Sequence, residues 1–386
     1  MNGLVVEEIS GNGAIDRLAP GWRRLFDAAV SASPFLAFEW MRAWDRWLGV
    51  GGTARLIVAR AGSQPVSVLP LWSPRPRRAG MGVRRLAFMG ERFVGADGLD
   101  LLAEPGEERE AAAAVAGYLA GEGRFDILEL RGMPGDSPML QQLAWRFGDD
   151  RRFDFRLAAA ELCPRLDLEG GWASVRRQSR RGHEFGRKLR KLEQLDGYEY
   201  RASVTPEQAS QAVDRFLALH ERRWEREGGS AATGWPQVKA FHREVAREAA
   251  RCGLLRFEEL WAEGACRASV YGLEHGPRFS FYQCGFDPTW TRQSVGFVAL
   301  GLSIQGAAER GMRTYDFLRG TEPYKFDWAP AVGSTVTMCI ARRSARTSLA
   351  LARDRMAESA RLAARAALPE WGMQSLRRLR RGRQVR

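Results

Sequence analysis

The chain has 386 residues and a formal net charge of +13, with 45% hydrophobic and 27% charged residues. This length exceeds one ordinary domain, so we expect two, and the 13 Trp and 19 Phe exclude a disordered chain. No apolar run reaches the ~18 residues of a membrane span, and five scattered cysteines without a Cys-x-x-Cys pair argue against a disulfide framework and against a zinc site.

Apolar runs bounded by turn residues predict strands, and apolar residues at helical spacing predict helices. In the first half, the predicted strands are 4–9, 54–60, 65–72, 83–89, 99–102, 125–131 and 153–162, and the predicted helices are 14–31, 36–48, 107–121 and 137–148. In the second half, the predicted strands are 198–204, 254–261, 266–274, 278–286, 313–318 and 334–342, and the predicted helices are 172–194, 206–227, 235–252, 296–311 and 345–380. The two series follow a matching order, so the sequence predicts an α/β (α+β) fold built from a duplicated unit.

A short motif supports the duplication. An aromatic residue and an aspartate precede Leu-Arg-Gly at 125–132, and the same types recur at 315–320. The aspartates, Asp126 and Asp316, lie 190 residues apart, close to half the chain. The spacing within the motif differs by two residues, which preserves the face of a strand on which each side chain lies.

Positive charge is concentrated in two segments. Residues 176–191 carry +7 and residues 341–386 carry +10, which leaves −4 for the rest of the chain. This distribution is not that of a protein that coats nucleic acid uniformly, and we expect no DNA partner. The first segment, in the predicted 172–194 helix, is either a solvated linker helix or a surface for an anionic acceptor, a carrier protein or tRNA. The second combines leucines with arginines, which is typical of an amphipathic helix on an anionic membrane surface, with a solvated disordered tail as the alternative.

Several motifs, taken in order, resemble the CelD-type (cellulose-biosynthesis-associated) acyltransferase family of the GNAT superfamily. They are Pro34-Phe35, Glu39-Trp40, Trp44, 66–71, 126–130, 220–224, 241–243, 315–320 and 324–328. The resemblance implies tandem GNAT-like domains in a FemAB-like arrangement, each with a mixed, mostly antiparallel sheet flanked by helices. The expected boundaries are a first domain at 1–165, a basic linker helix at 166–196, an acyltransferase domain at 197–343 and a basic amphipathic tail at 344–386. The resemblance also implies transfer of an acyl group to an amine or hydroxyl. The implied co-substrate is acyl-CoA, and acetyl-CoA is one candidate.

A GNAT enzyme holds the pyrophosphate of acyl-CoA on free amides at a helix start, where the helix dipole also favours anions. The predicted cofactor-binding residues are Arg292, Gln293, Ser294 and Gly296, before the 296–311 helix. Ser294 is expected to cap the helix, and Gly296 to allow close approach of a ligand. A plain capped helix is the alternative, and the absence of the superfamily's last small loop residue leaves an acyl-carrier protein open as the donor. The corresponding first-half loop, 102–110, carries four glutamates and would repel a pyrophosphate.

The predicted catalytic residues follow the second Asp-containing motif. Asp316 or Glu322 is expected to act as the base, Tyr324 as the acid toward the leaving thiolate, and Lys325 as a holder of an anionic group. Lys325 is one of four lysines against 55 arginines, so its retention hints at a need for a compact ammonium group. The alternative is that Asp316 and Arg319 form a buried structural pair. No histidine or cysteine spacing suggests a metal, and none is expected.

The leading prediction is therefore a GNAT-type enzyme that acylates a small-molecule or glycan-precursor acceptor related to the envelope or to polysaccharide. A FemAB-like transferase that uses aminoacyl-tRNA is the second prediction, and a non-catalytic GNAT-fold module recruited to a membrane is the third. The N-terminus carries no basic cluster, so a cytoplasmic protein is expected, peripheral at the inner face of the membrane if the tail binds lipid.

Overall fold

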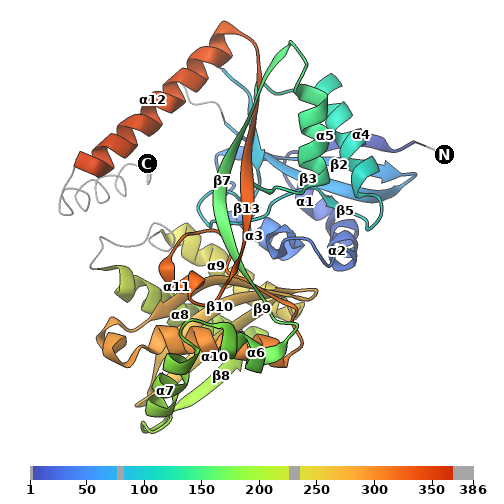
Figure 1. The fold of residues 1–386 in the computed structure, drawn as a ribbon. Coiled ribbons are helices and arrows are strands. Elements are labelled where there is room, and N and C mark those ends of the chain that lie inside the picture. The colour runs from blue at the N-terminus through green and yellow to red at the C-terminus, as the bar shows by residue number, and fades with distance from the viewer. Residues whose placement is uncertain (1–2, 76–81, 226–234, 368–386) are drawn as a thin grey trace.

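The computed structural model describes residues 3–75, 82–225 and 235–367, and Figure 1 shows two halves, each made of strands and helices. The first half comprises β1 (Val5–Ser10), α1 (Ala14–Arg17), α2 (Ala19–Ala28), η1 (Pro34–Leu36), α3 (Phe38–Trp47), β2 (Gly52–Ala61), β3 (Gln64–Pro74), β4 (Arg85–Phe88), β5 (Leu102–Ala103), α4 (Glu108–Gly121), β6 (Ile127–Pro134), α5 (Pro138–Phe147) and β7 (Phe153–Asp167).

The second half repeats this order after two short helices. It comprises α6 (Gly171–Gln178), α7 (Gly182–Leu192), β8 (Glu199–Ser203), α8 (Pro206–Glu225), α9 (Pro236–Arg251), β9 (Leu255–Ala262), β10 (Ala265–His275), β11 (Arg278–Phe286), η2 (Pro288–Gln293), α10 (Val295–Glu309), β12 (Thr314–Asp316), α11 (Pro323–Phe326), β13 (Ala331–Arg342) and α12 (Ala345–Ala367). The predicted duplication of an α/β unit is thus confirmed in the element order.

The strands form one sheet in which the halves exchange their last strands. The sheet order is β1-β2-β3-β4-β6-β13-β7-β12-β11-β10-β9-β8. β6 of the first half pairs with β13 of the second, and β12 of the second half pairs with the end of β7 of the first. β7 and β13 also pair with each other from Phe153 to Arg165, and Figure 1 shows them side by side between the two halves. Each half therefore completes the sheet of the other.

The core also crosses between the halves. Trp40 and Phe35 of the first half lie in one buried cluster with Phe241 and Tyr282 of the second. The ring of Trp40 meets those of Phe241 and Tyr282 edge-on, with centroids 5.0 Å and 5.4 Å apart. A second core cluster lies on the other face of the second-half sheet, where α6, α7 and α10 cover it. The sheet of the second half thus has a distinct apolar environment on each face.

The predicted 172–194 helix is two helices, α6 and α7. Ser179 has an extended backbone, and its hydroxyl donates to the Asp327 carbonyl at 3.0 Å. The amide of Arg180 donates to the same carbonyl at 3.2 Å. A Cβ on Gly182 would lie 2.0 Å from the Arg176 carbonyl, so glycine is required where the chain turns. Helical periodicity does not reveal this anchor, because Asp327 is distant in the sequence.

The tail begins as a docked helix. α12 ends at Ala367, and the rest of the predicted 345–380 helix lies outside the described residues. Ala350 is buried against Val83, Ile127 and Ala341 of the body, while Leu349 and Met356 are 59% and 73% exposed. None of the helices in the described ranges is long and apolar enough to cross a membrane.

The strand exchange predicts that the two halves unfold together. Ile340 of β13 is fully buried and pairs with Leu128 of β6 and Phe155 of β7. We expect Ile340→Ala to lower the free energy of unfolding by about 2–5 kcal/mol in one cooperative urea transition, followed by tryptophan fluorescence and circular dichroism. Val332→Ala, at a 46% exposed position of the same strand, is the control and should change little. Two transitions, of which only one shifts in Ile340→Ala, would contradict the coupling.

Candidate active site

The second-half sheet is split beside β11. β11 and β12 pair in parallel only where Arg278–Ser280 faces Thr314–Asp316. Beyond Asp316 the chain follows β7 instead, because the amides of Phe317 and Gly320 donate to the carbonyls of Pro164 and Leu162 at 3.0 Å and 2.9 Å. Among the described residues, no strand pairs with the rest of β11 on that side. A cavity lies on each face of the sheet around this split.

The first cavity, the donor cavity, has a volume of about 280 Å³ on the α10 face. It is lined by Arg181, Arg223, Phe281, Cys284, Phe286, Thr291, Ser294, Val295, Gly296, Phe297, Leu300 and Tyr324. Three predicted site residues, Ser294, Gly296 and Tyr324, therefore meet in one cavity. Arg292 and Gln293 are exposed beside it and do not line it.

The start of α10 differs from the predicted cap. Ser294 is the N-cap residue, but its backbone is left-handed, with φ 61°, and its side chain makes no capping hydrogen bond. The predicted capping role of Ser294 is therefore wrong. Among the described residues, no acceptor is found for the amides of Val295, Gly296 and Phe297. A Cβ on Gly296 would lie 2.9 Å from the Phe286 ring, so this glycine also permits close packing of α10 on β11. The helix start thus offers free amides beside an apolar wall.

Two arginines that sequence reasoning did not single out line the donor cavity. Arg223 donates to the Cys284 carbonyl at 3.1 Å and lies 4.9 Å from the centre of the Phe286 ring. Arg181 stacks 4.2 Å from the Phe297 ring centre and pairs with Glu184 at 2.7 Å. Arg181 also pairs with Asp327 at 3.2 Å, so its charge is largely neutralised within the protein. Positive potential at this cavity therefore comes mainly from Arg223 and the start of α10.

The predicted catalytic residues divide between two environments. Tyr324 lines the donor cavity opposite Phe281, with ring centroids 6.4 Å apart, and burial raises the pKa of its phenol, which keeps it protonated. Lys325 is 4% exposed, and its ammonium donates to the Arg319 carbonyl at 2.6 Å and pairs with Glu322 at 3.0 Å. Glu322 is exposed and lines neither cavity.

Asp316 does not pair with Arg319. Its carboxylate pairs with Arg165 of β7 at 3.1 Å and accepts from the amide of Leu318 at 2.8 Å. Arg319 instead pairs with Asp97 of the first half at 3.1 Å. The alternative of an Asp316–Arg319 pair is therefore wrong, because the exchanged strand and the first half supply the partners. The first-half Asp126 likewise pairs with Arg84, at 3.1 Å, and not with Arg131.

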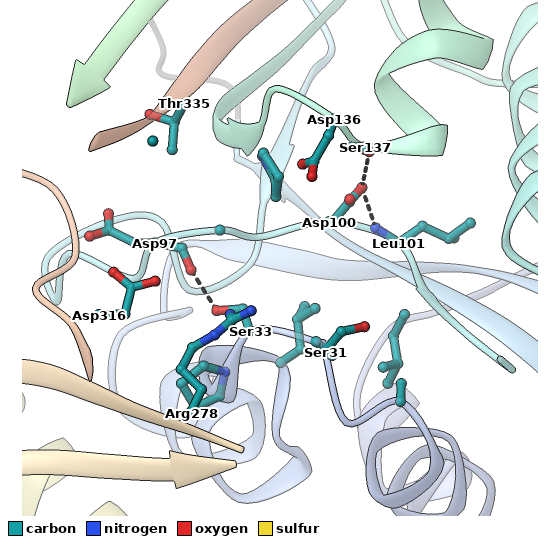
Figure 2. A pocket seen from close by; sticks show the side chains of 18 of the residues that line it. Ser31, Ser33, Asp97, Asp100, Leu101, Asp136, Ser137, Arg278, Asp316 and Thr335 are labelled. Carbon is teal, nitrogen blue, oxygen red and sulfur yellow. Dashed lines mark hydrogen bonds between the residues drawn. The ribbon is translucent and has the colours of Figure 1, made fainter. Parts of the chain in front are cut away.

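The second cavity, the inter-half cavity, has a volume of about 770 Å³ and receives residues from both halves. Figure 2 shows Asp97, Asp100, Asp136 and Asp316 around it, with Arg278 and several hydroxyl groups. Ser280 of β11 lines this cavity, whereas its neighbour Phe281 lines the donor cavity. Since successive residues of a strand point to opposite faces, the two cavities lie on opposite sides of the split sheet.

Two aspartates of the inter-half cavity are hard to ionise. Burial raises the pKa of Asp97 to about 6, against the lowering effect of Arg319. Burial also raises the pKa of Asp100 to about 6, although this carboxylate accepts from Ser137 and from the Leu101 amide, both at 2.8 Å. Raised carboxyl pKa values in a cavity are typical of functional sites.

The two helical histidines lie in the core. His220 and His242 are 2% and 1% exposed, and burial lowers their pKa values to about 4 and about 3. Neither lines the donor cavity or the inter-half cavity. Within the described residues there is no group of three or more His, Cys, Asp or Glu suited to a metal ion.

The corresponding first-half loop is occupied by its own acids. Glu104 pairs with Arg24, and Glu108 accepts from the Gly106 amide at 2.9 Å. Glu107 is the N-cap residue of α4, and Glu108 and Glu110 lie in the first turn. These charges meet the helix dipole from within the protein, so this helix start is a poor site for a phosphate.

Comparisons with known proteins agree with this geometry. Residues 178–326, which include the donor cavity, match the acetyltransferase (GNAT) domain family. The prediction of a GNAT-type acyltransferase is therefore confirmed for this part of the chain. No protein of curated function matches the sequence.

Similar solved structures extend over both halves. FemX is 11% identical, with a TM-score of 0.58 over 82% of this chain and 95% of that chain. The C-terminal domain (DUF2156) of a protein assigned as a lysylphosphatidylglycerol synthetase from Agrobacterium fabrum is 10% identical, with a TM-score of 0.54 over 87% and 95%. L-PGS from Bacillus licheniformis is 11% identical, with a TM-score of 0.51 over 83% and 97%. At such identities the likeness shows the fold, and the predicted tandem GNAT-like fold is confirmed.

The raised pKa of Asp97 gives a test of the inter-half contact. Its folded-state pKa of about 6 lies above the ordinary 3.8, so Asp97 binds a proton on folding. The contribution of Asp97 to the free energy of unfolding therefore falls as the pH rises through that window. Asp97→Asn keeps an oxygen that can accept from the Arg319 amide but does not titrate. We expect the melting temperature of Asp97→Asn, relative to the wild type, to rise between about pH 4 and pH 7. Asp354→Asn, at an exposed carboxyl group, is the control, and parallel curves for Asp97→Asn and the wild type would contradict the assignment.

Proposed function

We propose that the protein moves an acyl group from acyl-CoA, bound in the donor cavity, to an amine or hydroxyl of an acceptor in the inter-half cavity. The single observation that carries this proposal is the meeting of Ser294, Gly296 and Tyr324 in one cavity at the split between β11 and β12. The split connects the two faces of the sheet, so a donor on one face and an acceptor on the other would approach each other there.

The donor cavity suits a ligand with an anionic end and an apolar arm. The free amides of α10 would hold phosphate oxygens, and Arg181 and Arg223 would add charge-assisted hydrogen bonds. Phe281, Phe286, Phe297 and Leu300 form an apolar wall suited to a thioester arm. Acyl-CoA supplies the activated acyl carbon that the acceptor attacks.

The residues at the split divide the proton transfers. The acceptor loses a proton as its nitrogen or oxygen bonds to the acyl carbon, and Asp316, which lines the acceptor side, would take it. The C–S bond breaks, and the protonated phenol of Tyr324 would give its proton to the thiolate. Lys325 and Glu322 would position the Tyr324 side chain, because their contacts fix the turn that carries it.

A second candidate donor is aminoacyl-tRNA. The observation in its favour is the exposed cationic surface of α6 and α7, formed by Arg176, Arg177, Arg180, Arg187, Arg190 and Lys191. This surface reaches the donor cavity, because Arg181 lines that cavity and Lys188 donates to the Arg292 carbonyl at 3.3 Å. Binding of CoA, of aminoacyl-tRNA or of neither would separate an acyl-CoA enzyme, a tRNA-dependent enzyme and a binding module.

The acceptor pathway and the cellular location belong to the same proposal. The CelD-type resemblance favours an envelope or polysaccharide precursor as the acceptor. The exposed Leu349 and Met356 on α12 favour contact of this helix with an anionic membrane from the cytoplasmic side.

Ser294→Asp tests the donor cavity. Aspartate tolerates the left-handed backbone and suits an N-cap position, so the melting temperature should not fall. Its charge would repel phosphate, so we expect CoA to bind at least about tenfold more weakly by calorimetry. Ser294→Asn, of the same shape without the charge, is the matched control and should bind nearly as the wild type does. Equal CoA affinity in Ser294→Asp and Ser294→Asn would refute the assignment.

Tyr324→Phe tests the proton donor. The ring contact with Phe281 remains, so the fold and the KM for acetyl-CoA should be kept. Loss of the phenolic proton should lower kcat by about 10²–10⁴, measured as thiol release in the presence of amine and alcohol acceptors. Tyr198→Phe, at a tyrosine outside both cavities, is the control. A kcat within a factor of about two of the wild type would remove Tyr324 from the mechanism.

A further inference from the structure

The inter-half cavity contains an arginine that forms no ion pair with any of the described residues. Arg278, at the start of β11, lines the cavity, and Figure 2 shows its guanidinium group beside Asp316 and Ser33. Among the described residues it has no ion pair or side-chain hydrogen bond, whereas the neighbouring Arg165 pairs with Asp316. Burial lowers the pKa of Arg278, although an arginine stays charged. A partly buried, unpaired guanidinium group is costly unless a ligand supplies an anion.

A buried hydroxyl group adds a second unsatisfied position. Thr335 of β13 is 6% exposed, lines the same cavity, and its Oγ1 has no hydrogen-bond partner in the described part of the chain. It lies at a bulge between β13 and β7: Ser334 pairs with Leu162 and Val336 with Ala159, so Thr335 alone faces two residues of β7. Such a bulge re-aims a side chain away from the regular pleat. Thr335 can therefore donate a hydrogen bond to a ligand.

Carboxylates occupy other walls of the cavity. Asp100 is held by Ser137 and by a backbone amide without a cationic partner, and Asp136 has no ion pair among the described residues. Asp97 lies beside Asp316 in Figure 2 and forms an ion pair with Arg319. An ammonium group in the cavity would stabilise these carboxylates in their charged form.

We propose that this cavity selects an acceptor that carries both an amine and an anionic group, a carboxylate or a phosphate. The anionic group binds Arg278, and the amine lies among the carboxylates next to the split. Thr335, which lies apart from Arg278 in Figure 2, donates a hydrogen bond to another oxygen of the acceptor. This assignment rests on the proposed acyl transfer and narrows its acceptor to a dipolar amine. A polyamine would leave Arg278 unneutralised, and a compound with only negative charge would face four aspartates.

The reaction with such an acceptor balances. The ammonium group gives up two protons and its nitrogen bonds to the acyl carbon, while the C–S bond breaks. One proton ends on the thiolate and the other is released through a carboxylate to solvent. The products are an amide, a free thiol and one proton. The volume of about 770 Å³ admits acceptors much larger than a single amino acid.

Binding to the full-length protein without donor tests the proposal. The probes are 6-aminohexanoate with hexylamine and hexanoate, and O-phosphoethanolamine with ethylamine and ethyl phosphate. In at least one set we expect the dipolar compound to bind about tenfold or more tightly than either partner, and the preferred set identifies carboxylate or phosphate as the anion. Equal binding of dipolar and singly charged compounds in both sets would overturn the proposal.

Variants locate the anion site. Arg278→Met should weaken dipolar binding by about tenfold to a hundredfold, and Arg278→Lys should restore part of it. Arg313→Met, at a 72% exposed arginine, is the matched control and should bind as the wild type does. If Arg278→Met does not fold, Thr335→Val serves instead, because the Thr335 hydroxyl group has no hydrogen-bond partner to lose among the described residues. A preference that survives in both Arg278→Met and Thr335→Val would refute the site.

CoA affinity separates this proposal from the proposed function. Arg278→Met should bind CoA as the wild type does, because Arg278 lies outside the donor cavity. If the wild-type protein does not bind CoA but binds dipolar compounds in an Arg278-dependent way, the acyl-CoA assignment is wrong and the dipolar site remains supported. If the wild-type protein binds CoA but shows no preference for dipolar compounds, the dipolar site is wrong and the acyl-CoA assignment remains supported.

Discussion

The paired strands β7 and β13 are the constraint on which the rest of the molecule depends. Because each completes the sheet of the other half, the halves cannot separate without breaking three ladders, β7–β12, β6–β13 and β7–β13. Both strands also carry cavity residues: Arg165 comes from β7 and Thr335 from β13. The shape of the inter-half cavity is therefore fixed by backbone hydrogen bonds, and a ligand bound there meets walls that are already in place.

The same exchange explains why the sheet splits where it does. A chain leaving β12 would ordinarily continue beside β11, but the end of β7 offers carbonyl groups that Phe317 and Gly320 use instead. β11 then keeps an open edge, and the start of α10 lies beside it with free amides. In the first half, the equivalent helix start is surrounded by glutamates. The two halves thus have similar folds, and the negative charge at the start of α4 distinguishes the first half from the second.

Much of this could be predicted from the sequence, because period and turn residues report local structure. The element order and the duplication follow from such patterns, whereas Ser294, Gly296 and Tyr324 are named as site residues through the GNAT resemblance. The strand exchange could not be predicted, because the apolar pattern of a strand does not indicate which other strand pairs with it. The break between α6 and α7 depends on the distant Asp327 carbonyl, and the left-handed Ser294 on packing after η2. Arg278 and Asp97 carry no motif, so only the assembled cavity identifies them.

The turn between the two cavities is held by contacts from both halves. Leu318 has a positive φ of 57°, which is strained for a residue other than glycine, so the turn needs support. Asp316 holds the Leu318 amide, Asp97 holds the Arg319 amide and Lys325 holds the Arg319 carbonyl. A Cβ on Gly320 would lie 2.8 Å from the Lys325 ammonium, so glycine is required beside the Lys325–Glu322 pair. Since Asp97 belongs to the first half, the orientation of Tyr324 depends on both halves. The donor cavity and the inter-half cavity are thereby joined through one short turn.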